Sequence, residues 1–350
     1  MASQDATRLP NRAVQRIPLF TDVVLRFEET APERKDGDFI VRWETQVARQ
    51  SIELPNFVMS EDAARTLLTT ADGRTPGLRA IVRLEPIRRP VPNGPLQLDR
   101  WTRLGALTVA PIGPDALEAK ETELIRFTTG YGAGGTYEAD VTALAPLLSG
   151  RRLMRLSVAT YGDHPGWRAS AELIVDPAAT GRRDPLIAMP LFDDLHYDAE
   201  QMPLRTEVTV PAGASSPRIR IVTSGHSTDG TGANEFATAT HILRVDGREV
   251  ARWRPWRDGD PSLRERNPWA GTLVVNGKTL RASDLDRSGW APGAAVEPMI
   301  IPLPELTPGL HRIDLRILGI RKAEPDSTGH GYFAVTATLL ADKQWSGDDE

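Results

Sequence analysis

The sequence predicts an all-β protein. Short runs in which apolar and polar residues alternate with a period of two dominate the chain, as expected for strands with one buried face. Pro and Gly clusters separate these runs, and the totals of 28 Pro and 29 Gly are too high for long helices. Two dipeptides that favour tight hairpin turns also lie between alternating runs. These three observations together predict antiparallel sheets joined by turns.

The individual elements follow from the same patterns. The hairpin dipeptides are Asp246-Gly247 and Asn276-Gly277, which suit the positive φ angles of a type I′ turn. One short helix is predicted over residues 60–68, where a serine can cap the first turn and two acidic residues follow it. The predicted strands cover residues 38–45, 79–84, 218–222, 311–318 and 332–340.

The length of the chain favours two domains. At 350 residues it is too long for one ordinary jelly roll. The polar, Pro-flanked segment 177–185 lies between two apolar runs, and domain boundaries usually fall in such segments. We therefore predict an N-terminal domain over residues 17–180 and a C-terminal domain over residues 186–343, each large enough for a two-sheet sandwich.

Composition and charge exclude several classes of protein. Hydrophobic residues make up 40% and charged residues 25% of the chain, a normal balance for a soluble globular protein. The formal net charge of −5 gives no sign of a nucleic-acid binder. No run approaches the roughly 18 apolar residues of a membrane helix. The arginines are spread along predicted strands and are expected on a solvated sheet face; examples are Arg218, Arg220, Arg312 and Arg316.

The chain offers no obvious cofactor chemistry. The absence of cysteine excludes disulfides, thiol catalysis and thiolate metal sites. The six histidines show no spacing typical of metal ligands, so neither a metal nor another cofactor is predicted. Residues 1–20 lack the apolar core of a signal peptide, which leaves two interpretations: a cytoplasmic protein, or a mature form whose signal has been removed.

Several short motifs resemble those of the peptide-N-glycosidase F family. They keep the order and nearly the spacing of that family between residues 98 and 293, which makes chance agreement of the whole set improbable. In chain order the motifs are Leu98-Asp99-Arg100-Trp101, Phe127-Thr128-Thr129-Gly130-Tyr131, Asp140-Val141-Thr142, Leu147-Leu148-Ser149-Gly150, Ser224-Gly225-His226, Glu235-Phe236, Thr240-His241, Asn267-Pro268 and Asp286-Arg287-Ser288-Gly289-Trp290-Ala291-Pro292-Gly293.

The resemblance implies a fold and an activity. It implies two tandem eight-stranded antiparallel jelly-roll sandwiches, packed side by side, with the active site in the cleft between them. The implied reaction is hydrolysis of the amide between an asparagine side chain and the first N-acetylglucosamine of an N-linked glycan. The implied partners are N-glycosylated peptides or glycoproteins, and we expect a monomer that is secreted or periplasmic.

The resemblance also assigns roles to individual residues. Amide hydrolysis without a metal needs an activated water and a donor for the leaving nitrogen, and two carboxylates can supply both. Asp99 matches the primary catalytic acid and is expected to orient and activate the water, while Glu235 polarises the scissile amide or binds the sugar. Arginine can bind substrate or fix a carboxylate, and aromatic rings suit sugar faces. The substrate-binding candidates are Arg100, Trp101, Tyr161, His226, Arg287 and Trp290.

The sequence departs from the family at two kinds of position. Ala233, Ala237 and Ala291 stand where the family has cysteines, and Ala159 stands where it has a third acidic residue. The loss of that acid favours an alternative, a non-catalytic glycan-binding or surface-interaction protein that keeps the fold. A second alternative is a relative that cleaves another amide or glycosidic bond with a rearranged carboxylate set, to which Asp163 or Glu172 could contribute.

Overall fold

The computed structural model describes residues 13–26, 34–36, 39–41, 47–55, 76–90, 98–112, 120–160, 165–179, 186–199, 201–227, 234–321 and 331–343. Throughout this part of the chain the strands pair antiparallel and the only helices are short 3-10 turns, so the predicted all-β class is confirmed. We call residues 13–179 the first half and residues 186–343 the second half.

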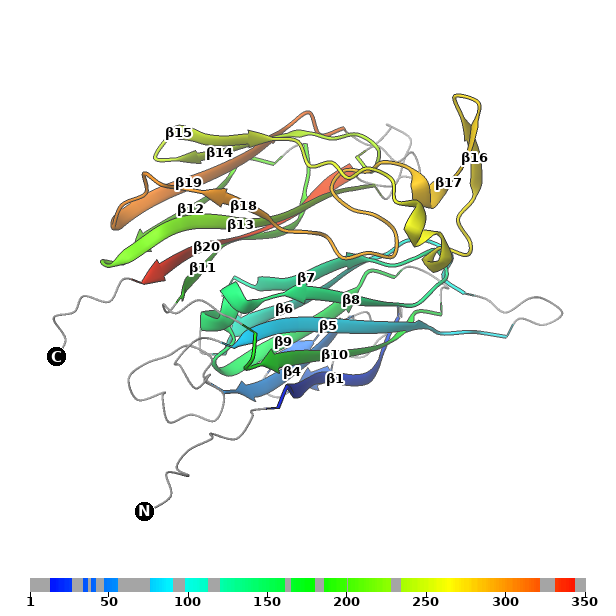
Figure 1. Ribbon diagram of the computed structural model, residues 1–350, viewed down its shortest axis with the longest axis horizontal. Coiled ribbons are helices and arrows are strands. Elements are labelled where there is room, and N and C mark those ends of the chain that lie inside the picture. Colours follow the sequence, from blue (N-terminus) through cyan, green and yellow to red (C-terminus); the bar gives the residue numbers. More distant parts are fainter. Residues whose placement is uncertain are drawn as a thin grey trace, which may run out of the picture.

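The first half contains two four-stranded sheets (Figure 1). One has the order β1-β10-β5-β8 and the other the order β4-β9-β6-β7. Their strands are β1 (Gln15–Leu25), β4 (Val47–Leu54), β5 (Gly77–Pro86), β6 (Leu104–Pro111), β7 (Thr122–Thr128), β8 (Gly135–Asp140), β9 (Gly150–Val158) and β10 (Trp167–Asp176).

The second half repeats this plan. Its two four-stranded sheets have the orders β11-β20-β13-β18 and β12-β19-β14-β15. Their strands are β11 (Leu186–Tyr197), β12 (Leu204–Val210), β13 (Ala214–Ser227), β14 (Thr240–Val245), β15 (Arg248–Trp253), β18 (Met299–Pro302), β19 (Gly309–Leu318) and β20 (Gly331–Lys343).

Both halves have jelly-roll topology. When the eight strands of each half are numbered 1 to 8 in chain order, one sheet has the order 1-8-3-6 and the other has the order 2-7-4-5. This interleaving of two Greek keys defines a jelly roll. The resemblance to a jelly-roll family therefore led to the correct fold class, which strand patterns alone did not specify.

Within the described residues, the remaining elements are two small hairpins and three 3-10 helices. They are β2 (Arg34–Asp36), β3 (Phe39–Val41), β16 (Thr272–Val275), β17 (Lys278–Arg281), η2 (Thr142–Leu147), η3 (Pro261–Arg266) and η4 (Ala282–Asp284). The predicted hairpin turns are confirmed by positive φ angles: 52° and 83° at Asp246-Gly247, and 50° and 75° at Asn276-Gly277. The predicted helix over residues 60–68 lies outside the described residues.

Each half has its own hydrophobic cluster. The first is built around side chains such as Leu107, Leu156 and Trp167, and it also includes Leu340 of β20; the second is built around Leu243 and Phe333. Two separate hydrophobic clusters are typical of two domains. We therefore propose that the domains have the limits predicted from the sequence, 17–180 and 186–343.

The two halves are joined by main-chain hydrogen bonds. β7 is buried along its whole length. At its end, Thr128 N donates to Ala294 O (3.0 Å), Gly293 N donates to Thr128 O (2.9 Å) and Val296 N donates to Arg126 O (2.8 Å). A sheet edge of the first half is thus extended by a segment of the second, which fixes their relative position.

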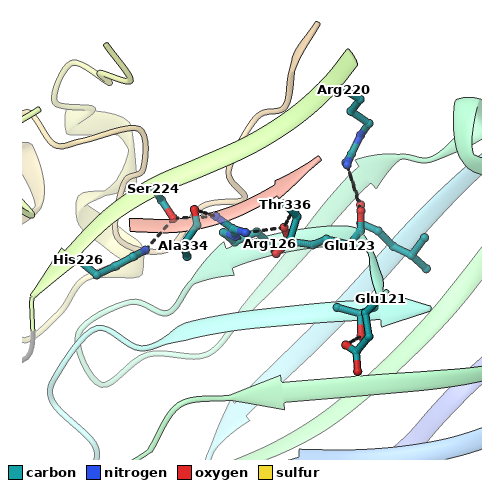
Figure 2. Close-up of polar contacts among 10 residues, drawn as sticks. Glu121, Glu123, Arg126, Arg220, Ser224, His226, Ala334 and Thr336 are labelled. Carbon is teal, nitrogen blue, oxygen red and sulfur yellow. Dashed lines mark hydrogen bonds and ion pairs between the residues drawn. The ribbon is translucent and has the colours of Figure 1, made fainter. Parts of the chain in front are cut away.

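A buried ion pair lies at the same junction (Figure 2). Arg126 binds both carboxylate oxygens of Glu123, at 2.8 and 2.7 Å, and neither side chain is exposed. The same guanidinium donates across the junction to Ser224 Oγ (3.2 Å) and to Ala334 O (2.6 Å), and Thr336 Oγ1 donates to Glu123. Charged groups so deeply buried need this complete set of partners.

One predicted surface residue proves to belong to this junction. Arg220 was expected on a solvated sheet face, but it is only 6% exposed. Its guanidinium donates to Glu123 O (3.1 Å) and Leu124 O (3.4 Å) of β7. The expectation was wrong because the outer face of β13 is covered by the first half. Arg312 and Arg316, in contrast, are exposed as predicted.

No helix among the described residues is long and apolar enough to cross a membrane. In the same part of the chain, no three His, Asp or Glu side chains come together in a way that could hold a metal ion.

Two buried histidines make the fold sensitive to acid. Burial lowers the pKa of His226 from 6.5 to about 3 and that of His241 from 6.5 to about 4. Both folded-state values lie below the unfolded value, so protons bind preferentially to the unfolded chain between pH 6.5 and these values. Stability is therefore fully present above pH 6.5 and is lost as the pH falls.

We expect the free energy of unfolding to fall between pH 6.5 and 5 by up to about 1.4 kcal/mol per pH unit for each of these histidines. Urea titrations at pH 7, 6 and 5 measure this slope. In the variant His241→Gln the slope should be shallower. His311 acts in the opposite direction, because its hydrogen bond to Asp246 raises its pKa. An unchanged free energy over this interval would contradict the prediction.

Candidate active site

Arg287 organises the candidate site. The residue follows η4 and its backbone is bridged to Arg257, with N–O distances of 2.9 and 2.8 Å. Its side chain is fully buried. The guanidinium donates to the main-chain carbonyls of Leu285 and Ala282, both at 2.8 Å. These bonds hold the arginine in a fixed orientation.

The remaining donors of Arg287 bring the two halves together. Nε donates to Glu235 Oε1 (3.0 Å) and Nη2 donates to the hydroxyl of Tyr131 (3.0 Å). Tyr131 belongs to the first half, and Glu235 and Arg287 belong to the second. Burial raises the pKa of Tyr131, and the negative charge of Glu235 raises it further, whereas the positive charge of Arg287 acts to lower it. The net effect is an increase, so the phenol stays protonated near neutral pH.

Glu235 is the accessible carboxylate of this cluster. Its side chain is 20% exposed, whereas Arg287 is fully buried beneath it. The main chain of Glu235 accepts a hydrogen bond from Ser288 N (3.0 Å), which ties the glutamate to the loop that carries Arg287. A carboxylate fixed on one side by a buried arginine and open on the other can bind a substrate amide or a water molecule.

Asp99 lies in the loop before β6 and is held differently. Its side chain is fully buried, and both carboxylate oxygens accept hydrogen bonds from Arg103, at 2.7 and 2.9 Å. Trp101 N also donates to Oδ1 (3.2 Å). Arg103 received no role from the sequence, although the four-residue spacing of an acid and an arginine was a visible signal.

A continuous series of contacts links Asp99 to Glu235. Arg103 N donates to Thr129 Oγ1 (2.8 Å), and Thr129 N donates back to Arg103 O (2.9 Å). Two residues further along, Tyr131 contacts Arg287, which binds Glu235. The segment 129–131 therefore connects the hydrogen bonds of Asp99 to those of Glu235, so both predicted catalytic residues contact one short stretch of chain at the junction.

Asn267 fixes the loop that carries Tyr131. Its side chain is fully buried; Oδ1 accepts from Tyr131 N (3.3 Å), and Nδ2 donates to Leu263 O (2.8 Å) and Pro292 O (3.1 Å). The Asn-Pro motif was noticed in the sequence, but its function as a clamp between the halves was not. Gly130 completes the fit, because an added Cβ would lie 2.0 Å from Arg266 O.

Exposed aromatic residues adjoin these groups. Trp101 is 63%, Trp269 44% and Phe236 42% exposed. The guanidinium of Arg100 stacks on Trp269 at 4.4 Å, and that of Arg287 lies 4.9 Å from the Phe236 ring. The faces of such exposed aromatic rings suit the CH faces of sugars.

Three predicted substrate-binding residues are buried: Arg287, as described above, and also Trp290 and His226. Trp290 is 2% exposed, its Nε1 donates to Gly225 O (2.7 Å), and its ring packs on His226. His226 is also buried, with Nε2 2.7 Å from Ser224 Oγ. As placed here, neither ring presents a face to a substrate. Their motifs marked the right region, but motif position carries no information on exposure.

The other sequence candidates are placed as follows. Tyr161 and Asp163 lie outside the described residues. Ala159 continues the β9 pairing through its backbone N, which donates to Leu104 O (2.8 Å). Glu172 forms ion pairs with Arg16 and Arg83 on another sheet, so no contact brings it to Asp99 or Glu235 as a replacement acid.

Comparison with known proteins agrees with this architecture. A family model described as the C-terminal part of peptide-N-glycosidase F matches residues 195–340. A structure of PNGF-II superposes with a TM-score of 0.74 at 20% identity, covering 95% of this chain and 66% of that chain. The chain therefore spans just under two thirds of the length of PNGF-II. No curated protein matches the sequence.

A second solved structure covers both chains almost completely. It is PNGase F, a glycosylasparaginase from Flavobacterium meningosepticum, with a TM-score of 0.64 at 16% identity over 95% of this chain and 96% of that one. The protein thus has the all-β fold of a glycan-related amidase. Its resemblance to the peptide-N-glycosidase F family, first indicated by short motifs, is confirmed for the fold and for the sequence of the second half.

Proposed function

We propose that this protein hydrolyses the amide bond between asparagine and the first N-acetylglucosamine of N-linked glycans. The observation that carries the proposal is the partly exposed carboxylate of Glu235, held by the buried Arg287 at the junction of two jelly rolls. The fold shared with PNGase F, itself described as a glycosylasparaginase, supports the same reaction. We also propose that the protein acts as a secreted or periplasmic monomer on glycoproteins or glycopeptides.

The proposed reaction needs only water and the substrate. The oxygen of water bonds to the amide carbon and the carbon–nitrogen bond breaks, leaving aspartate in the peptide and a glycosylamine. Glu235 polarises the amide, and Asp99 accepts the proton of the water, which then passes to the leaving nitrogen. For this, a water molecule replaces one of the two Arg103 bonds to Asp99. The hydrogen bonds from Arg103 N to Thr129 Oγ1 and from Thr129 N to Arg103 O keep the loop in place.

We expect the exposed aromatic residues to bind the sugar. Replacing Trp101 by Ala should raise KM about 3–10-fold with little change in kcat, because a stacking surface contributes roughly 0.5–1.5 kcal/mol. Steady-state kinetics on a fluorescent N-glycopeptide measure both constants. Leu310→Ala, at an exposed apolar residue on β19, is the matched control. Equal KM values for Trp101→Ala and the wild type would remove Trp101 from the sugar site.

Activity should survive chelators and thiol reagents. The chain has no cysteine, and the described residues hold no cluster suited to a metal ion. Glycan release should therefore proceed at the same rate in excess EDTA and after treatment with iodoacetamide. Inactivation by EDTA that is reversed by adding a divalent metal would overturn the metal-free mechanism.

A specific observation supports a second candidate, a non-catalytic glycan-binding protein. Both oxygens of Asp99 are engaged by Arg103, and Ala159 stands where the family has its third acid. Such a protein would retain glycopeptides without cleaving them. Incubation with a denatured N-glycoprotein separates the candidates: glycan release with conversion of Asn to Asp indicates the amidase. Retention of the intact glycopeptide indicates the binding protein, and cleavage of another bond indicates a different hydrolase.

A further inference from the structure

A cavity of about 180 Å³ lies on the sheet β12-β19-β14-β15. This sheet is the outer layer of the second half, on the side away from the first half and from the β13–β20 sheet that contacts it (Figure 1). Four of its lining residues are arginines and one is an aspartate. The complete lining is Pro203, Arg205, Ile242, Arg244, Gly247, Arg312, Asp314 and Arg316.

Strand register explains why the arginines gather. Asp314 on β19 pairs with Arg205 on β12 and with Arg244 on β14. Cross-strand partners point to the same face of a sheet. Arg312 and Arg316 lie two residues before and after Asp314, so they share that face as well. Four guanidiniums therefore surround one carboxylate.

The carboxylate does not neutralise this group. Arg205 and Arg312 bind Asp314 through their Nε atoms, and these two arginines hold its pKa below the usual value although burial opposes them. The lining carries four positive charges and one negative charge, a net +3, in a chain whose net charge is −5. Positive charge is therefore concentrated at this cavity, although the net charge of the chain is negative.

The nearby acids do not change this sign. Glu249 lies 3.8 Å from Arg244 but is bound at both oxygens by Arg252, at 2.8 and 2.9 Å. Glu207 faces Arg312 across β12 and β19 without forming an ion pair with it. Within the part of the chain that the structure describes, Arg316 forms no ion pair.

The floor of the cavity is apolar. Ile242 lies opposite Arg316 in the sheet and is only 4% exposed, although its strand position points it outward. The aliphatic stems of long charged residues cover apolar surface in this way while their charged ends remain in water. The cavity therefore combines an apolar floor with a rim of guanidiniums, which suits a ligand that has both a CH face and an anionic oxygen group.

We propose that this cavity binds a sulfate or phosphate ester group carried on a sugar. Arginine presents paired donors that match such oxyanions, and the net positive lining attracts them. The identification of the anionic group rests on the cavity itself. The sugar as its carrier rests on the proposed function, and would make the cavity a second attachment point for acidic glycans, remote from Glu235.

Isothermal titration at constant ionic strength tests the proposal. The probes are N-acetylglucosamine 6-sulfate, N-acetylglucosamine 6-phosphate, unsubstituted N-acetylglucosamine and inorganic sulfate. We expect saturable binding of one or both esters, tighter than that of inorganic sulfate or the plain sugar, and the stronger ester identifies the group. In Arg244→Gln/Arg316→Gln the affinity should fall about a hundredfold, since two charge-assisted bonds are lost and each is worth roughly tenfold. Arg88→Gln, at an exposed arginine of the first half, should change nothing.

A variant that is expected to strengthen binding distinguishes the loss of binding groups from damage to the fold. Asp314→Asn removes the negative charge from the centre of the cavity and should tighten ester binding about tenfold, because the repelling carboxylate is gone. Absence of saturable ester binding, equal binding by inorganic sulfate, or an unchanged affinity in the double variant would overturn the proposal. The titration requires no turnover, so a protein that releases no glycan but binds the ester refutes only the proposed function.

Discussion

Arg126→Met should lower the free energy of unfolding by about 3–5 kcal/mol. The substitution removes the guanidinium that binds both oxygens of Glu123, a carboxylate fully buried at the junction of the two halves. Thr336 of β20 remains as the side-chain partner of that carboxylate among the described residues. It also deletes the hydrogen bonds to Ser224 and Ala334 that cross the junction. Urea unfolding at pH 7 measures the loss.

A matched control isolates the effect of burial. Arg79→Met removes an arginine that pairs with Glu138 on the surface, where both side chains are nearly half exposed. That change should cost no more than about 1 kcal/mol. If both substitutions lowered stability equally, the junction pair would not hold the halves together as the geometry indicates. The double variant Glu123→Gln/Arg126→Met should recover part of the loss, because it no longer buries an unpaired charge.

Glu235→Gln should lower kcat for glycan release about 10²–10⁴-fold while changing stability little. The amide keeps the shape of the side chain and an oxygen for the Nε donor of Arg287, but it loses the charge that polarises the substrate. Single-turnover kinetics on an N-glycopeptide, together with a thermal melt, measure both quantities. Turnover comparable with the wild type would exclude Glu235 as a catalytic residue.

Asp99→Asn provides an informative comparison. It should reduce kcat to a similar extent but lower stability more than Glu235→Gln does, because Asp99 is fully buried and accepts two hydrogen bonds from Arg103. In Glu235→Gln the amide keeps an acceptor for Arg287, whose guanidinium also donates to Leu285 O, Ala282 O and the Tyr131 hydroxyl. The two carboxylates thus differ in how the protein uses them. Glu235 is accessible and braced on one side, whereas Asp99 is closed within the structure.

Much of the fold followed from local sequence patterns. Period-two alternation located strands such as β5, β13, β19 and β20. The Asp-Gly and Asn-Gly dipeptides specified the turns of two other hairpins, β14–β15 and β16–β17. These features depend on neighbours along the chain. The sequence could not show that the outer face of β13 is covered, so Arg220 was assigned to solvent. Alternation identifies the two faces of a strand but not what lies against the second one.

The site was only partly predictable for the same reason. Glu235 and Arg287 were both named from motifs, and they meet in the structure. The contacts made by Tyr131 and Asn267 join segments far apart in the sequence, which no local pattern reveals. Burial was equally hidden: His226 and Trp290 fell in the predicted motifs but lie inside the protein, where Trp290 packs against His226 and Arg287.

The central claim is that water cleaves the asparagine–sugar amide in this protein. The most direct measurement is incubation of a defined N-glycopeptide in water enriched in oxygen-18, followed by mass spectrometry of the peptide. The account predicts that the glycosylated asparagine becomes aspartate with one oxygen-18 atom in its side chain, and that Glu235→Gln gives almost none. A glycopeptide that is recovered intact, or a sugar cleaved so that asparagine retains its nitrogen, would contradict it.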